Sequence, residues 1–169
     1  MRPSGLYRES LSIFEALGDR RSAAQTQSLL ADLLSTRGQY DEAERLYRRS
    51  LLVFKALDDR RSTAVTQSRL ANLLNRRGQY DEAEQLYHTG LAIIQQLGDV
   101  QNIAIFLIKL ARLALARGYP SEAIPLLQQA RKRFEAIGLS DWVASVDRLL
   151  AEAQSTDASS VPPVEPVVN

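Results

Sequence analysis

The sequence has no cysteine, one histidine, one methionine and one tryptophan among its 169 residues. Without cysteine the chain can form no disulfide, no thiolate zinc site and no thiol nucleophile, and its redox compartment stays undetermined. The single histidine, His88, excludes metal sites built from several histidines. No glycine-rich phosphate loop precedes a Lys-Ser or Lys-Thr pair. We therefore expect no metal site, no cofactor and no enzymatic activity.

The sequence also lacks an excess of positively or negatively charged residues. Lys and Arg total 21 and Asp and Glu total 20, a formal net charge of +1, which gives little attraction to nucleic acid or anionic membranes. No segment approaches the roughly 20 apolar residues that span a bilayer, and no apolar run follows the N-terminal residues 1–5. We expect a soluble protein without an export signal, in the cytoplasm by default. The hydrophobic content of 45% is enough for a core.

The chain contains an internal repeat of 40 residues. Residues 11–50 and 51–90 are identical at 26 of 40 positions. A third copy is eroded but keeps its small and charged anchors at the same step, and a partial fourth copy runs from Gly138 to about Ala153. Periods of this size indicate a solenoid or array of repeated helical units.

Each period has the pattern of two helices. Apolar residues recur at steps of three and four, and no stretch alternates with a period of two over the length of a strand. Gly38, Gly78 and Gly118 stand where helices end, and Asp19 and Asp59 stand where the next helices begin. We predict eight helices, at 4–17, 20–37, 40–57, 60–77, 80–97, 100–117, 120–137 and 140–154.

Small residues recur where paired helices must approach closely. They are Ala31, Ala71, Ala111 and Ala151 on one kind of helix and Ala43, Ala83 and Ala123 on the other. With the hairpin glycine, the Tyr-Asp-Glu-Ala run and Tyr47 or Tyr87, this pattern resembles the tetratricopeptide repeat over roughly residues 3–153. The period exceeds the usual length of about 34 residues and is similar to the long variant of kinesin light chains and of many bacterial signalling proteins.

The resemblance implies an all-α fold, an α-solenoid of antiparallel helix pairs in a right-handed superhelix. We expect one repeat domain over 1–154, with copies near 20–57, 60–97 and 100–137 and partial units at 4–17 and 140–154. Residues 155–169 are rich in Ser, Pro and Val and are expected to be a disordered tail or a linker. Pro125 lies inside the seventh helix and predicts a late start or a bend there.

The N-terminal helix lacks the partner that precedes such a helix in the other copies. Its apolar stripe is Tyr7, Leu11, Phe14 and Leu17. Such a stripe indicates that the chain is a fragment, that this end of the repeat array self-associates, or that the helix is an unusual cap. At the other end, charged residues of the last helix suit the solvated outer face of a terminal cap.

Four other features could be taken for catalytic or binding residues, and each has a structural interpretation. His88 is read as a solvated surface residue, and Asp41-Glu42 as acidic residues favoured at a helix start. The Arg pairs are offset by neighbouring acids and are read as a solvated face. Trp142 is read as an anchor that packs the last helix.

In the family, the first helix of each repeat lines a concave groove. The resemblance places there Gln25, Ser28, Asp32 and Ser35, then Val65, Ser68, Arg69, Asn72, Asn75 and Arg76, then Ile105, Ile108, Lys109, Arg112 and Leu115, and finally Ser145, Arg148 and Glu152. The change from Asp32 to Asn72 to Arg112 fits a site with graded chemistry, and drift of exposed positions would also produce it.

The run 103–108 is apolar on every side. It is either an outward-facing apolar floor flanked by cations or the buried middle of a small solenoid. A floor of this kind suits a peptide with apolar anchors and acidic groups, with Arg side chains pairing carboxylates and Asn72 and Asn75 hydrogen-bonding the peptide backbone.

We predict a non-enzymatic scaffold that binds a peptide or helix of a partner protein in the groove. The predicted binding residues are Arg69, Asn72, Asn75, Arg76, Ile105, Ile108, Lys109, Arg112 and Arg148. The alternative is a self-associating or spacer segment of a larger protein, for example of a bacterial signalling ATPase, that assembles through the N-terminal stripe. The partner is predicted to be a protein or peptide, with a homo-oligomer as a further option and with no nucleic acid or membrane partner.

Overall fold

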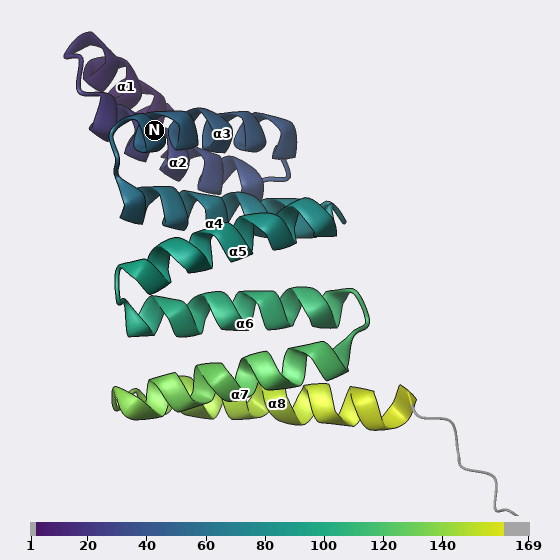
Figure 1. Cartoon of the computed structure of the whole chain (residues 1–169). Helices are drawn as coiled ribbons and strands as arrows, with labels where there is room; N and C mark the ends of the chain where they lie inside the picture. Colours follow the sequence, from purple (N-terminus) through teal and green to yellow (C-terminus); the bar gives the residue numbers. More distant parts are fainter. Residues whose placement is uncertain (1–2, 161–169) are drawn as a thin grey trace, which may run out of the picture. The chain divides into compact units, whose positions relative to one another are not determined.

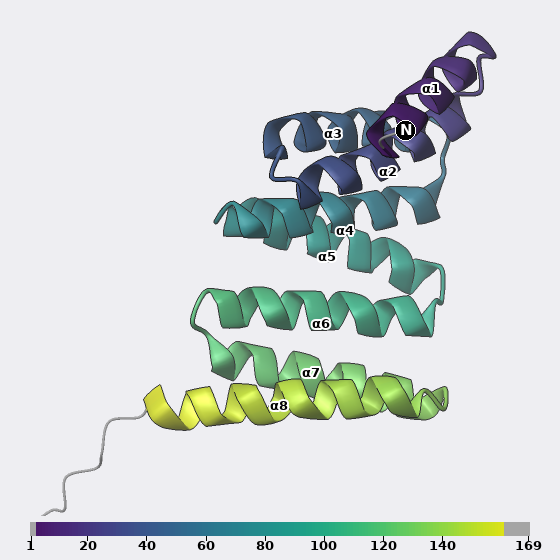
Figure 2. The same ribbon diagram turned by 180° about the vertical axis from the view of Figure 1, so that it is seen from behind.

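A computed structural model describes residues 3–160 of the chain and shows an all-helical fold over that range. Figures 1 and 2 show its helices from opposite sides. They are α1 (Pro3–Ala16), α2 (Arg20–Thr36), α3 (Tyr40–Ala56), α4 (Arg60–Arg76), α5 (Tyr80–Gln96), α6 (Val100–Ala116), α7 (Pro120–Ala136) and α8 (Ser140–Ser160). The predicted fold class and the predicted helix starts are confirmed, and only the last helix end is clearly wrong.

The repeated aspartates start helices as predicted. The Asp19 carboxylate accepts a hydrogen bond from the backbone N–H of Ser22 at 3.0 Å, and Asp59 accepts one from Ser62 at 3.1 Å. This satisfies one of the N–H groups that the first turn of a helix leaves without a partner.

The hairpin glycines end helices as predicted. After α2, Gly38 has a φ of +76°, and the N–H of Gln39 donates to the carbonyl of Leu34 at 2.9 Å. This is the left-handed helix end that glycine adopts at least cost. Asp58 occupies the equivalent left-handed position after α3, with a φ of +51°.

The chain divides into two compact units, Met1–Gly98 and Asp99–Asn169. In the first unit α2 packs on α3, α4 packs on α5, α3 packs on α4, and α1 covers α2 (Figure 1). In the second unit α7 packs on both α6 and α8. Helices that follow one another along the chain therefore form the core of each unit, and one repeat domain over 1–154 stays a prediction.

The cores contain the small residues that the repeat predicts at close helix contacts. Ala31, Ala43 and Ala71 in the first unit and Ala111 and Ala123 in the second have no exposed surface. Large side chains fill the space beside them, and fully buried ones include Tyr47, Phe54, Leu74, Leu127 and Phe134. Ala151 differs from the prediction because it is exposed on α8, where no helix of the described chain covers it.

The C-terminal third differs from the prediction in two places. α8 continues to Ser160 instead of ending at 154; Ala153 is fully buried, and the Thr156 hydroxyl donates to the carbonyl of Glu152 at 2.9 Å. The rest of the predicted tail, 161–169, lies outside the described residues. α7 begins at Pro120 with Pro125 inside it, so the predicted late start does not occur, and the alternative, a bend at Pro125, stays a prediction. Pro120 at the first helical position costs little because the first N–H groups of a helix have no helical partner, whereas Pro125 in the second turn removes one internal hydrogen bond.

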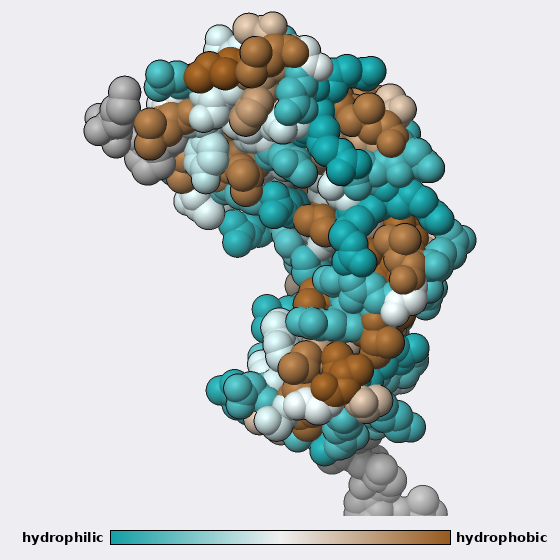
Figure 3. All heavy atoms as spheres, turned by 90° about the vertical axis from the view of Figure 1, so that its left-hand side faces the viewer, coloured by the Kyte–Doolittle hydropathy of each residue, from teal (hydrophilic) through white to brown (hydrophobic). Residues whose placement is uncertain are grey.

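None of the helices in the described part of the chain is long and apolar enough to cross a membrane. On the face drawn in Figure 3, several hydrophobic patches lie among hydrophilic residues.

Candidate binding site

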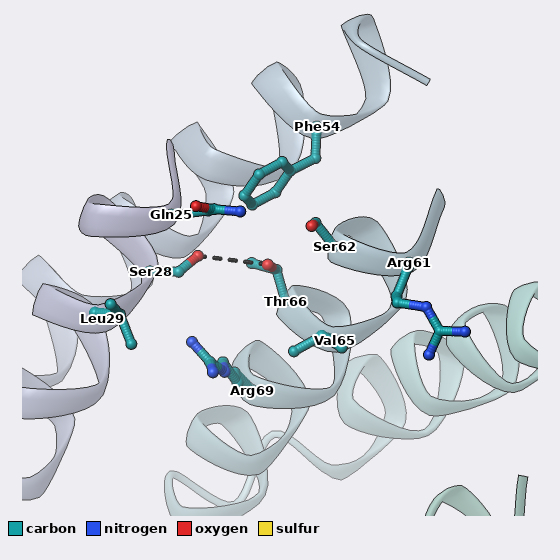
Figure 4. A pocket seen from close by; sticks show the side chains of 9 residues that line it. All are labelled: Gln25, Ser28, Leu29, Phe54, Arg61, Ser62, Val65, Thr66 and Arg69. Atoms are coloured by element: carbon teal, nitrogen blue, oxygen red, sulfur yellow. Dashed lines mark hydrogen bonds between the residues drawn. The ribbon is translucent and has the colours of Figure 1, made fainter. Parts of the chain in front are cut away.

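A pocket of about 350 Å³ lies in the first unit where α2 and α4 meet. We call it the α2–α4 pocket. Its lining residues, drawn in Figure 4, are Gln25, Ser28 and Leu29 of α2, Phe54 of α3, and Arg61, Ser62, Val65, Thr66 and Arg69 of α4. The first helices of two successive repeats thus supply most of its wall, as the resemblance implies for a groove.

The pocket combines apolar surface with hydrogen-bonding groups. Leu29 and Val65 are 41% and 36% exposed, so a bound group would remove apolar surface from water at both positions. Between them the hydroxyls of Ser28 and Thr66 lie 3.4 Å apart and join the two helices (Figure 4). Both residues are buried, so this hydrogen bond holds the floor of the pocket.

Arg69 extends from α4 beside Leu29 (Figure 4) and pairs with Asp32 of α2 at 2.9 Å. The other carboxylate oxygen of Asp32 accepts a hydrogen bond from the Tyr47 hydroxyl at 2.5 Å. Burial and then the Asp32 hydrogen bond raise the pKa of Tyr47, so this hydroxyl keeps its proton and remains a donor. Asp32 therefore joins α2, α3 and α4 and partly offsets the charge of Arg69.

The second repeat has the same tyrosine contact with a neutral acceptor. The Tyr87 hydroxyl donates to the side-chain oxygen of Asn72 at 2.6 Å, and burial raises the pKa of Tyr87. Asn72 therefore holds α4 to α5 with its carbonyl oxygen, and only its NH₂ group remains for a peptide backbone. The charge of Arg76 opposes the rise in the pKa of both Tyr47 and Tyr87.

The predicted binding residues divide between the two units. Arg69, Asn72, Asn75 and Arg76 lie on α4 in the first unit. Arg69 lines the α2–α4 pocket, Asn72 and Asn75 are half-buried, and Arg76 is exposed. Of the four, Arg69 pairs with Asp32 and Asn72 accepts the hydrogen bond of Tyr87.

In the second unit, α6 carries Ile105, Ile108, Lys109 and Arg112, and α8 carries Arg148. Arg112 and Arg148 are exposed and Ile105 is half-buried. The Lys109 ammonium lies 5.9 Å from the centre of the Phe106 ring.

Ile108 offers almost no surface to a partner because it is only 8% exposed. Ser28 and Ser68 occupy the same position of the repeat and are buried as well. The run 103–108 is buried except at Ile105. The structure thus favours a buried helix over an outward-facing apolar floor.

Sequence reasoning missed part of the pocket. The predicted groove included Gln25, Ser28 and Val65, and the structure adds Leu29, Phe54, Arg61, Ser62 and Thr66 to the lining. Ser62 and Thr66 have identical counterparts in the first copy, Ser22 and Thr26. Helical spacing was the available signal, because Ser62 precedes the predicted groove residue Val65 by three residues and Thr66 follows it by one.

The N-terminal stripe is less open than predicted. α1 packs on α2, and Tyr7, Leu11 and Phe14 are half-buried, whereas Leu17 is 73% exposed. Leu6 and Ile13, which also lie on α1, are 50% and 53% exposed. At the other end, the Trp142 ring stacks on Phe134 with centroids 5.1 Å apart, in line with the predicted anchor.

Among the described residues, no group of three or more His, Asp or Glu side chains could hold a metal ion. His88 is exposed on α5.

The chain matches a known protein family. The tetratricopeptide repeat family pattern matches residues 5–56 and 62–136. No curated protein matches the chain.

Solved structures resemble this fold over most of its length. BtubC (BKLC) from P. vanneervenii is 18% identical with a TM-score of 0.70, covering 98% of this chain and 77% of that one. A putative kinesin light chain of Podosopora anserina with nearly identical TPR-like repeats is 19% identical with a TM-score of 0.65, covering 91% and 86%. The N-terminal domain of stress-induced protein-1 from C. elegans is 13% identical with a TM-score of 0.58, covering 76% and 97%.

These likenesses show the fold, and the family pattern covers most of the chain. Tetratricopeptide repeat domains are generally protein-protein interaction modules and typically non-catalytic. The chain belongs to the tetratricopeptide repeat family.

Proposed function

We propose that this protein is a non-enzymatic interaction scaffold that binds a peptide or helix of a partner protein, with the α2–α4 pocket as the central contact. The observation that carries the proposal is the pocket itself, in which half-exposed Leu29 and Val65 lie beside the guanidinium of Arg69. An apolar side chain with a carboxylate nearby satisfies both kinds of group.

The mechanism is preorganisation. The Ser28–Thr66 hydrogen bond and the Asp32–Arg69 pair fix α2 against α4 before a partner arrives. Binding then does not have to order the receptor, which lowers its entropic cost. Specificity comes from which partner groups meet Val65 and which meet Arg69.

Selection of peptides from a random displayed library on the folded chain tests the proposal, because it does not require a known partner. We expect selected peptides to carry an apolar residue close to an acidic one. Val65→Asp should weaken their binding by about tenfold or more, because a buried charge opposes the apolar anchor. Val100→Asp is the matched control, since Val100 is 39% exposed and lies outside the pocket lining.

Arg69→Gln tests the charged part of the site, with Arg45→Gln on exposed α3 surface as its control. Selected acidic peptides should lose several-fold affinity to the first variant and none to the second. Peptides that bind Val65→Asp and Arg69→Gln as well as the unchanged chain would contradict the proposal, provided circular dichroism shows both variants folded.

A further inference from the structure

The repeat sorts the helices into two kinds. First helices of a repeat are α2, α4, α6 and α8, and second helices are α1, α3, α5 and α7. Each first helix from α2 to α6 packs on the second helix that follows it. Within the described residues 3–160, α8 has no following second helix and α1 has no preceding first helix. The two end helices thus expose opposite halves of the same kind of interface.

α3 shows which face of α1 is uncovered. In α3, the Tyr47 hydroxyl and the Ser50 hydroxyl both bond to α2, the latter to the carbonyl of Ala24 at 3.0 Å. Forty residues earlier, Tyr7 and Ser10 of α1 are only half-buried. Leu6 is 50% exposed, whereas its counterpart Leu46 is 8% exposed. The α1 face that carries these residues is therefore the face that a first helix covers in α3.

α8 keeps the complementary face. Small residues let the second helix approach a first helix closely, and in the complete repeats they are fully or almost fully buried: Ala24 and Ala31, Ala64 and Ala71, Ala104 and Ala111. Their counterparts Ala144 and Ala151 on α8 are exposed. Leu150 is half-buried, whereas Leu30, Leu70 and Leu110 at the same position are buried. α8 thus keeps the alanines of a first-helix interface without the helix that covers it, and exposed Asp147 and Gln154 replace the buried Gln27 and Leu34 of α2.

We propose that α1 of one molecule packs on α8 of a second copy, so that the two helices complete a repeat between molecules. The contact continues the interface that α2 forms with α3 and α4 forms with α5. It also offers a partner to two half-buried polar groups of α1, the hydroxyls of Tyr7 and Ser10. In this register Ser10 meets the carbonyl of Ala144 as Ser50 meets Ala24, and Tyr7 meets Glu152 where Tyr47 meets Asp32.

The contact joins different surfaces of the two molecules. A pair of molecules still has one uncovered α8 and one uncovered α1, so copies add head to tail until a ring closes or a chain continues. A symmetric dimer through α1 alone would leave Ala144 and Ala151 exposed. The register therefore predicts stepwise growth that does not stop at two copies unless an end is blocked.

One charged pair makes the register testable. Arg49 of α3 pairs with Glu15 of the preceding second helix at 3.0 Å. In the intermolecular repeat the same positions hold two like charges, Glu9 of one molecule and Glu135 of the other, and Glu135 also pairs with Arg131 of its own helix at 2.6 Å. Glu9→Arg should recreate the attraction and strengthen assembly several-fold, most clearly at low salt.

Mass measured by light scattering and sedimentation over a concentration series tests the unchanged chain first. We expect species heavier than the 18.9 kDa monomer to grow with concentration. A monomer that persists to about 1 mM, which corresponds to only about 4 kcal/mol of binding free energy, would overturn the proposal.

Two variants that each block one end give the decisive experiment. Leu6→Glu places a charge on the α1 face and leaves α8 intact, and Ala151→Glu does the reverse. Each should be monomeric alone, because a charge buried in the contact weakens it by about tenfold or more. Mixed in equal amounts, they should form a complex of one molecule each, through α1 of the Ala151→Glu variant and α8 of the Leu6→Glu variant.

Ala92→Glu is the matched control, since Ala92 is exposed on α5 and the equivalent residues Leu52 and Lys132 are exposed as well. It should assemble like the unchanged chain. Equal circular dichroism spectra show that the variants are folded. Two outcomes would overturn the proposal. Loss of assembly in Leu6→Glu but not in Ala151→Glu would indicate an α1–α1 contact instead. Failure of the two variants to associate when they are mixed would show that α1 does not pack on α8.

Discussion

At the scale of one residue, Asp58 has a strained backbone conformation at a position where the other repeats have glycine. It has a φ of +51°, whereas glycine holds the equivalent positions Gly18, Gly98 and Gly138. Aspartate tolerates this conformation better than most residues, but glycine adopts it at least cost. We expect Asp58→Gly to raise the free energy of unfolding by about 0.5–1 kcal/mol, measured by urea denaturation.

The reverse substitution, Gly18→Asp, is the matched test. A Cβ added at Gly18 would meet no heavy atom within 4 Å, so the change isolates the cost of the backbone conformation. We expect a loss of similar size. A stabilising effect of Gly18→Asp would contradict this explanation.

Asp19 links helix capping to pH. The backbone N–H of Ser22, followed by its side chain, donates to this carboxylate and lowers the pKa of Asp19 below the ordinary 3.8. A lowered pKa in the folded state means that the stabilisation is complete above the unfolded pKa and is lost as pH falls through the folded value. We therefore expect the free energy of unfolding to decrease below about pH 4.

Asn caps helices without titrating in this range. Asp19→Asn should therefore have a flatter dependence of stability on pH below 4 than the unchanged chain, in urea denaturation at a series of pH values. Parallel curves for the two proteins would show that Asp19 contributes nothing to acid unfolding.

At the scale of the element, the sequence predicts helices well because each signal is local. Asp59 and Gly78 occur at fixed steps in the repeat and decide where α4 begins and ends. The predicted end of α8 was wrong because Ser, Thr and Asp at 155–157 have a weak preference for helix, whereas α8 continues through them to Ser160, with the Thr156 hydroxyl bonded to the carbonyl of Glu152.

The candidate site was harder to predict because side-chain contacts between helices are not local. Asn72 has the type and spacing of a groove residue, yet its carbonyl oxygen is used by Tyr87. Ile108 occupies a groove position in the pattern and is buried. The sequence alone cannot show that position 32 of the first copy pairs with Arg69, since the two residues are 37 apart and lie on different helices.

The Asp32–Arg69 pair predicts how the pocket is tuned. Both side chains are about a third exposed or more, so the pair is worth at most about 1 kcal/mol. Asp32→Asn makes the first repeat like the second, keeps an acceptor for Tyr47 and removes the carboxylate that competes for Arg69. We expect acidic peptides to bind up to about fivefold more tightly to this variant, measured by isothermal titration calorimetry.

A neutral analogue of the same peptide serves as the control and should bind both proteins equally. Equal affinity of the acidic peptide for both proteins would mean that Arg69 does not contact the acidic group.

At the scale of the whole molecule, the two compact units separate the predicted binding residues. Every residue that lines the α2–α4 pocket lies between 25 and 69, inside the unit Met1–Gly98. Ile105, Lys109, Arg112 and Arg148 lie in the other unit. A peptide that needs only the pocket should not depend on the second unit, whereas a peptide that spans the predicted groove should.

A fragment of residues 1–98 distinguishes these cases, because repeat proteins are stabilised mainly by contacts between neighbouring repeats and partial arrays fold. We expect the fragment to be helical by circular dichroism and to bind a pocket-selected peptide within about twofold of the full chain, since the lining residues and their hydrogen bonds are all retained. Arg112→Glu in the full chain should then leave affinity for that peptide unchanged. Weaker binding by a folded fragment, together with weaker binding by Arg112→Glu, would instead extend the site onto α6 and make Arg112 a contact residue.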